Sequence, residues 1–322
     1  MKHGKWRGVN LGNWLLIETW MKRSLIEGTN ARDEYTLAEA KGNQAKDFFD
    51  RHRESFITED DFAFMQKWGI NAVRIPIGYW IVEPDGPYEG GIEHLDRALD
   101  WCRKYNIDGI IDLHGAPGHQ SGEHHSGRAR FFRWDKEEHY RKRTVEIIEA
   151  LAQRYVGHDG LAGISLLNEP DNEIPASLLL EYYQAGYEAV RKHLPADKVA
   201  VIAEAHQNPR MAQFHGKLKG ENIATDVHYY QCFWEEHKRL ELHEHIAYPL
   251  ERVLPRIRDY NHVGDQVVGE WSLSFGEPKW WEKLDPTRKL MAYQAFATAQ
   301  IYAYSEACGW FFWSYRVEGW PA

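Results

Sequence analysis

Two glutamates that lie far apart in the chain each stand at the end of a short apolar run. Glu169 follows the run Leu161–Leu167, and Glu270 follows Val267 and Val268. A carboxylate at the carboxyl end of a strand is typical of the catalytic face of a parallel α/β barrel. Two carboxylates are the minimum for cleaving a glycosidic bond, because one protonates the leaving oxygen and the other attacks or activates water. Either short motif alone could be a plain strand end, but the pair predicts a glycosidase.

This chemistry needs a scaffold that brings distant strand ends together, and the chain offers eight candidate strands. Most are continuous apolar runs, which indicates strands buried on both faces, as in a parallel sheet. No glycine-rich dinucleotide loop follows the first run, which disfavours a doubly wound sheet. The order therefore predicts a single α/β domain, residues 1–322, folded as a closed (β/α)8 TIM barrel. The candidate strands are Lys5–Leu11, Ala72–Ile77, Asp108–Leu113, Leu161–Leu167, Lys198–Ala203, Ile223–His228, Gln266–Glu270 and Gly309–Tyr315.

Five helical patterns separate these strands. Thr58 and Asp61 have the spacing of a capping box, which would open the first helix. The segment from Glu18 to about Phe56 is too long for a simple connection, so we expect a long loop excursion after the first strand. The chain ends seven residues after Tyr315, so the usual last helix is expected to be short or missing. The candidate helices are Phe62–Trp68, Ile92–Lys104, Lys136–Tyr155, Ala176–His193 and Arg288–Ala307.

The composition favours an enzyme with a neutral substrate. Hydrophobic residues make up 43% of the chain, and the net charge of −9 without a long basic run argues against a nucleic-acid partner. The three scattered cysteines indicate a reducing compartment. No segment is long and apolar enough to span a membrane, and no signal peptide precedes the first strand. A cytoplasmic location is therefore expected, unless an upstream export signal has been removed.

Several histidines raise the question of a metal. His119, His124 and His125 fall in one predicted loop, and His243 and His245 form a second group. Without an accompanying carboxylate or thiolate pattern, such histidines are more typical of surface or substrate-binding positions. We therefore expect no metal, and we expect no other cofactor.

Six motifs follow one another along nearly the whole chain: Arg7–Gly12, Val73–Trp80, Asp112–Gly118, Leu166–Pro170, His228–Gln231 and Gly269–Ser272. Together they resemble glycoside hydrolase family five, of clan A, and within it they are most similar to the exo-β-1,3-glucanases. The resemblance implies a retaining β-glycosidase that cleaves an oligosaccharide by double displacement.

The resemblance also implies roles for single residues. Glu270 would be the nucleophile and Glu169 the acid/base. Arg74 would hold Glu270 ionised and Tyr230 would orient it, although Arg74 could also be a structural cation paired with either glutamate. Asn168 would bond the sugar 2-hydroxyl. The expected substrate-binding residues are Glu18, Trp20, Arg74, His114, Asn168, His228, Tyr230, Phe233 and Trp313. For Glu18, the alternative is that it caps the helix that follows.

The chain departs from the glucanase pattern near the predicted leaving-group side. Glu123, followed by His124 and His125, stands where the glucanases carry a phenylalanine, so Phe233 is the half of their aromatic clamp that is kept. Trp20 replaces a tyrosine near the −1 sugar. A β-mannosidase with the same core residues is therefore one alternative. A non-catalytic carbohydrate-binding barrel is an alternative of another class.

The expected mode of attack is exo. The excursion after the first strand carries Glu18 and Trp20, and the loop from Gly115 to Trp134 would form the opposite rim. Together they would wall off the cleft beyond the −1 sugar. Such a pocket would release single sugars from the non-reducing end of a β-linked gluco-oligosaccharide.

Overall fold

Eight parallel strands close into one barrel in the computed structural model, which describes residues 4–206, 214, 216–276 and 278–319. Each strand pairs with the next in sequence, and β8 pairs with β1, so the sheet has no free edge. The predicted (β/α)8 barrel is confirmed. The strands are β1 (Trp6–Asn10), β2 (Ala72–Gly78), β3 (Asp108–Gly115), β4 (Leu161–Ser165), β5 (Ala200–His206), β6 (Ile223–Tyr229), β7 (Asp265–Trp271) and β8 (Gly309–Phe312).

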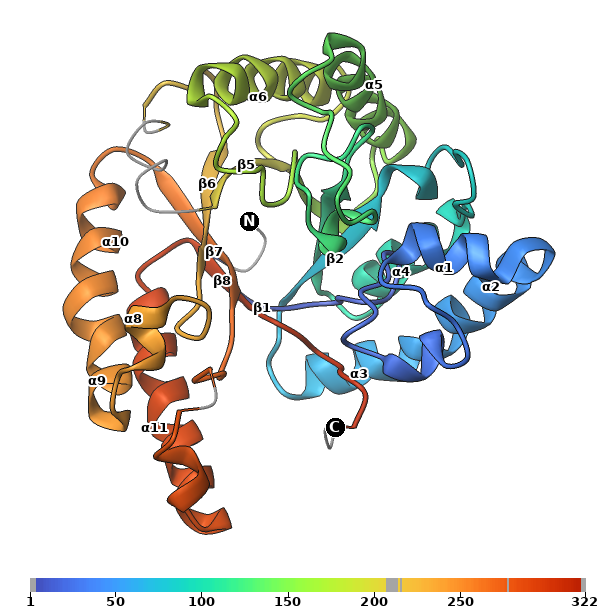
Figure 1. The fold of residues 1–322 in the computed structure, drawn as a ribbon. Coiled ribbons are helices and arrows are strands. Elements are labelled where there is room, and N and C mark those ends of the chain that lie inside the picture. Colours follow the sequence, from blue (N-terminus) through green and yellow to red (C-terminus); the bar gives the residue numbers. More distant parts are fainter. Residues whose placement is uncertain (1–3, 207–213, 215, 277, 320–322) are drawn as a thin grey trace.

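The helices surround the strands on the outside of the barrel (Figure 1). Helices α5 and α6 lie together on one side, α9, α10 and α11 lie on a second side, and α1 to α4 occupy a third. The helices are α1 (Glu34–Lys41), α2 (Ala45–Phe56), α3 (Glu59–Lys67), α4 (Ile92–Lys104), α5 (Glu138–Arg154), α6 (Ala176–Arg191), α8 (Glu235–Lys238), α9 (Leu242–Tyr248), α10 (Leu254–Asn261) and α11 (Pro286–Tyr304).

Most predicted elements form, with boundaries that shift by a few residues. Every residue of β2 and of β3 is buried, as the continuous apolar runs indicated. Helix α4 has the predicted bounds. The capping box of Thr58 and Asp61 forms as predicted, but α3 already begins at Glu59. Strand β8 ends at Phe312 and not at Tyr315, because the backbone after it leaves the sheet.

The excursion after β1 corrects the expectation of a long loop. It contains α1 and α2, and its apolar residues form a separate small cluster that includes Ile17, Leu37 and Phe49. The three helices α8 to α10 between β6 and β7 were not predicted either, since two of them are only one or two turns long. Within the described residues no helix follows β8, in line with the expectation of a short or missing last helix.

Glu34 anchors the excursion to the barrel. The side chain is fully buried at the start of α1, accepts hydrogen bonds from the backbone of Ile17 (2.6 Å) and the indole of Trp80 (2.8 Å), and lies 3.6 Å from the guanidinium of Arg53. Burial raises the pKa of Glu34 to about 7, although the charge of Arg53 and the hydrogen bonds act in the opposite direction.

Substitution of Glu34 by glutamine should therefore change how stability depends on pH. Between the ordinary carboxyl value of 4.5 and about 7, the folded chain keeps a proton on Glu34 that the unfolded chain has lost. The contribution of Glu34 to the free energy of unfolding consequently falls as pH rises through this window. The free energy of unfolding of Glu34→Gln minus that of wild type should therefore rise by about 3 kcal/mol between pH 4.5 and pH 7.5, as measured by urea denaturation. The exposed Glu39 of the same helix supplies the control, Glu39→Gln. A wild-type-to-Glu34→Gln difference that is constant over this range would contradict the assignment.

Two further findings concern location. In the described part of the chain, no helix has the length and apolar character needed to cross a bilayer. Cys102, Cys232 and Cys308 are not joined by disulfides. The reducing compartment and the cytoplasmic location stay predictions.

Candidate active site

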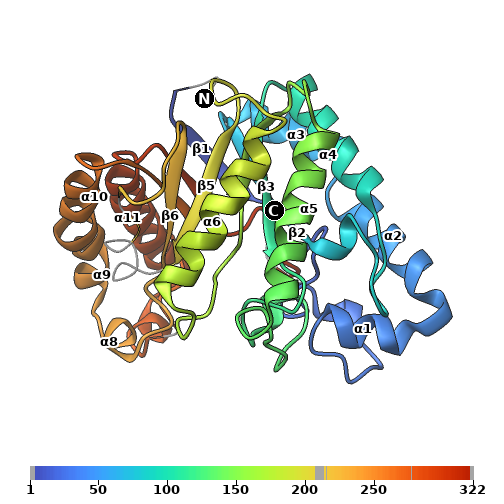
Figure 2. The same cartoon turned by 90° about the horizontal axis from the view of Figure 1, so that it is seen from above.

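The predicted site residues gather at the end of the barrel where the strands finish. In Figure 2 the helices α1 and α8, which belong to connections that follow β1 and β6, lie together at the lower end of the barrel. Every strand except β5, or the segment that follows it, supplies a predicted site residue. A continuous set of hydrogen bonds and ion pairs links seven of them, which are Arg74, His114, Asn168, Glu169, His228, Tyr230 and Glu270.

Arg74 is the centre of this network. Its side chain is buried on β2, with Nη1 3.0 Å from Glu270 Oε1 and Nη2 2.6 Å from Asn168 Oδ1. Nη2 also lies 3.0 Å from Asp112 Oδ1. Burial alone would lower the pKa of Arg74, but the charges of Asp112, Glu270 and two further carboxylates raise it above its ordinary value. Arg74 therefore stays charged, and it is paired with Glu270, as predicted, rather than with Glu169.

The orientation of Asn168 follows from its two neighbours. Its Oδ1 accepts from Arg74, so its Nδ2 faces His114 Nε2 at 3.2 Å and donates to it. The ring of His114 can accept there because its Nδ1 donates to Asp112 at 2.6 Å. Asp112 thus pairs with Arg74 and, by accepting from Nδ1, selects the tautomer of His114. It lies inside the third motif, but its position within a strand gave no sign of this role.

Glu270 is held at both oxygens. Arg74 contacts Oε1, and the hydroxyl of Tyr230 donates to Oε2 at 2.7 Å. Burial, together with the charge of Glu270, raises the pKa of Tyr230 well above its ordinary value, so the hydroxyl stays a donor. The preceding Gly269 has no room for a side chain, because a Cβ would lie 2.1 Å from Asp226 Oδ2. The Gly269 N–H donates to Asp226 at 2.6 Å, which ties β7 to β6 directly before Glu270.

Glu169 is held by histidines. His228 Nδ1 lies 2.7 Å from its Oε1, and His125 Nε2 lies 3.2 Å from its Oε2. The backbone of Glu169 has φ +39°, a left-handed conformation that non-glycine residues seldom adopt and that is commonest at functional sites. His125 was expected only as a surface or substrate-binding histidine of a predicted loop, and its contact with Glu169 was not predicted.

Buried carboxylates inside the strands surround His228 and were also missed. His228 Nε2 lies 3.5 Å from Glu204 Oε1 and 3.7 Å from Asp226 Oδ2. Burial would lower the pKa of His228, but Glu204, Glu270 and the neighbouring hydrogen bonds raise it well above its ordinary value. The amide of Asn10 on β1 reaches the carbonyl of Gly269 and accepts from Arg74. These residues lie within apolar runs, where a single polar residue carries no signal of its partner.

Of the remaining predicted residues, Glu18 and Trp313 are buried, whereas Trp20 and Phe233 are exposed. Glu18 is buried, accepts from the indole of Trp20 at 2.8 Å, and has its pKa raised to about 7 by burial. Trp313 stacks on His114 with a ring-centroid distance of 5.7 Å. Phe233 packs edge-on against Tyr230 and is 65% exposed, so it stands at the rim.

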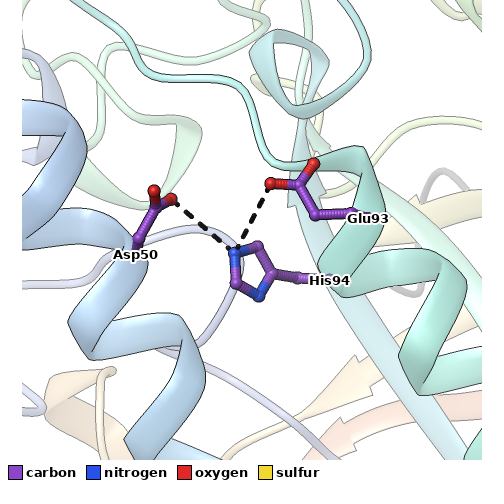
Figure 3. Close-up of side chains that lie close together, drawn as sticks. All are labelled: Asp50, Glu93 and His94. Atoms are coloured by element: carbon purple, nitrogen blue, oxygen red, sulfur yellow. Dashed lines mark ion pairs between the residues drawn. The ribbon is translucent and has the colours of Figure 1, made fainter.

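Two groups of histidine and carboxylate side chains in the described structure have ligand atoms close enough to hold a metal. One consists of Glu169, Glu204 and His228, which already pair with one another at the barrel mouth. The other joins α2 to α4 (Figure 3): His94 Nε2 faces Asp50 at 3.7 Å and Glu93 at 3.9 Å.

The second group has the features of a polar contact between helices, formed by a neutral histidine. Burial lowers the pKa of His94, which favours the neutral ring. Arg97 donates to its Nδ1 at 2.6 Å, so the ring proton sits on Nε2 and points toward the carboxylates. A metal would need a lone pair at that nitrogen. The absence of a metal and of other cofactors stays a prediction.

Comparisons with known proteins agree with this geometry. The family model described as "Cellulase (glycosyl hydrolase family 5)" matches residues 33–319. The probable glucan 1,3-beta-glucosidase A of Emericella nidulans is 33% identical over 360 residues, covering 98% of this chain and 86% of that protein. The glucan 1,3-beta-glucosidase of Blumeria graminis is 31% identical, with 98% and 83% covered. Among solved structures, the rutinosidase from Aspergillus niger superposes with a TM-score of 0.81 at 22% identity, covering 98% of this chain and 90% of that one. At this identity, the structural likeness concerns the fold alone.

Proposed function

The chain belongs to glycosyl hydrolase family 5 and is an O-glycoside hydrolase, and from this premise we propose a retaining, exo-acting β-glycosidase of β-linked gluco-oligosaccharides. One observation carries the retaining mechanism. His228 Nδ1 lies 2.7 Å from Glu169 Oε1 and 3.5 Å from Glu270 Oε2. Glu169 Oε1 and Glu270 Oε2 can therefore be no farther apart than the sum of these two distances. That is less than the separation of roughly 6.5–9.5 Å in inverting enzymes and compatible with about 5–5.5 Å in retaining ones.

In the proposed reaction, Glu270 attacks the anomeric carbon while Glu169 gives its proton to the glycosidic oxygen. The bond between the anomeric carbon and the glycosidic oxygen then breaks. Glu169, now a base, takes a proton from water, which attacks the anomeric carbon and releases Glu270. Arg74 and Tyr230 contact the two oxygens of Glu270 and so hold the carboxylate in one orientation for the first step. The fixed orientation of Asn168 supports its role as a ligand of the sugar 2-hydroxyl.

Contacts between the two rims support the exo mode. The excursion after β1 and the loop after β3 are joined where Tyr35 N–H donates to the Gly127 carbonyl at 3.0 Å and Ala129 N–H donates to Asp33 at 2.8 Å. These bonds would close one side of the mouth beyond the −1 sugar. The buried Glu18 at the same side would bond sugar hydroxyls.

The names of the relatives favour glucose and a β-1,3 linkage. A β-mannosidase is retained as the second candidate because Glu123 stands where the glucanase clamp has an aromatic side chain and leaves that clamp incomplete. The assignment of all 322 residues to one catalytic domain is part of the proposal.

Digestion of a laminari-oligosaccharide, followed by proton NMR and chromatography, tests the proposal. We expect β-glucose as the first signal, because double displacement retains the anomeric configuration, and stepwise shortening from the non-reducing end. Parallel digestions of a cello-oligosaccharide and a manno-oligosaccharide identify the sugar and the linkage. An initial α-anomer would overturn the retaining mechanism, early internal fragments would overturn the exo mode, and binding without any hydrolysis would favour a carbohydrate-binding barrel.

A further inference from the structure

We propose that His125 is a positioning residue for Glu169, holding one carboxylate oxygen between turnovers and yielding it to the leaving group when substrate binds. This inference rests on the proposed acid/base role of Glu169. His125 lies in the 3-10 turn His124–Ser126, within the loop after β3 where the chain departs from the glucanase pattern.

Each oxygen of Glu169 faces its own imidazole. His228 lies 2.7 Å from Oε1, and His125 lies 3.2 Å from Oε2. The side chains of His125 and Glu169 are 15% and 18% exposed, so this contact lies within the site but open to an incoming sugar. His228 is buried and is also held by Glu204, so it has little freedom to move. We infer that Oε2 is the oxygen that meets the glycosidic oxygen.

The turn that carries His125 is fixed by its own hydrogen bonds. Ser126 Oγ donates to the carbonyls of Ser121 at 3.2 Å and Glu123 at 2.9 Å, and the Ser126 carbonyl lies 2.7 Å from the buried His119 Nδ1. The neighbouring His124 reaches in another direction, with Nε2 3.7 Å from Glu18 Oε2. The two adjacent histidines therefore have different nearest carboxylates, Glu18 for His124 and Glu169 for His125.

The chemical consequence concerns the second half of the reaction. An imidazole N–H beside Oε2 favours the ionised form of Glu169, which is the base that activates water. Without His125, Glu169 should keep its proton to higher pH. The basic limb of the kcat/KM profile reports this proton in the free enzyme. Other groups also act on this limb and stay in place in the variant. They are His114, Glu204, His228, Glu270, Glu18 and Tyr230, on β3, β5, β6 and β7 and in the segments that follow β1 and β6, together with His124 in the loop after β3.

The test is the pH profile of kcat/KM for a laminari-oligosaccharide, whose sugar leaving group needs the proton of Glu169, in His125→Ala and His125→Gln, with His124→Ala as the matched control. We expect the basic limb of His125→Ala to move up by about one pH unit, with the acid limb unchanged. His125→Gln should show a smaller shift than His125→Ala, because the amide N–H of glutamine can donate from a similar position. His124→Ala should leave the basic limb in place, and circular dichroism checks that all variants fold.

A basic limb that stays in place in a folded His125→Ala variant would overturn the inference. An equal shift in His124→Ala would do the same, since it would indicate a general effect of the loop. Failure of this inference can be distinguished from failure of the proposed function. The proposed function is tested by substitution of Glu169 and Glu270, in chains that keep His125.

Discussion

Replacement of Glu270 by alanine should abolish turnover of every β-glycoside, with kcat falling on the order of 10⁴-fold or more. The proposed covalent intermediate forms on Glu270, so its removal cannot be compensated by a better leaving group. The variant should still fold, since Arg74 keeps Asp112 at 3.0 Å and Asn168 at 2.6 Å as partners. Initial rates on an aryl β-glucoside and on a laminari-oligosaccharide measure the effect.

Tyr230→Phe is the matched control for this experiment. It removes the hydroxyl that donates to Glu270 Oε2 at 2.7 Å but leaves the carboxylate and the ring in place. We expect a much smaller loss, on the order of 10- to 100-fold, because one hydrogen bond to a charged group is lost. Substantial residual turnover by Glu270→Ala, comparable to that of the control, would show that Glu270 is not the nucleophile.

Replacement of Glu169 by alanine should give the second largest effect, and its size should depend on the leaving group. A natural sugar leaving group needs a proton and should be cleaved on the order of 10³-fold more slowly. An activated aryl glycoside needs little protonation, so formation of its covalent intermediate should be nearly unchanged. A burst of aryl product followed by slow turnover is expected, because no base activates water for the second step.

Added azide should accelerate turnover of Glu169→Ala, since azide attacks the intermediate without general-base help. The product should be a β-glycosyl azide, because two inversions retain the configuration. Asn168→Ala is a useful comparison at the adjacent position, because it should slow both substrate types and show no azide rescue. Equal losses on both substrate types in Glu169→Ala would contradict the acid/base assignment.

Much of the fold and of the proposed site could be predicted from the chain itself. Buried parallel strands are continuous apolar runs, and a polar residue directly after such a run must lie at the barrel mouth once the strands are parallel. This reasoning placed Glu169, Glu270 and Tyr230 correctly at one end. It also identified the capping box at Thr58, because capping depends on residues only three positions apart.

Other features depended on contacts between segments far apart in sequence. Helices α1 and α2 were missed because their stability comes from packing onto the barrel, through contacts such as Glu34 with Trp80. The predicted strand Gly309–Tyr315 was longer than β8 for a similar reason. An apolar, aromatic run continues past Phe312, but the strand ends where its partner in β7 ends.

The sequence by itself determined the order of the strands, the family likeness and the pair of glutamates, because apolar runs and short motifs are local features of the chain. Only the tertiary structure decided which groups neutralise one another. Asp112, Glu204 and Asp226 lie inside strands, and their pairing with Arg74 and His228 follows from strand register and barrel closure. The contact between His125 and Glu169 likewise depends on how the loop after β3 folds back over the mouth. A buried charge requires a partner, but its own neighbours in sequence do not reveal which one.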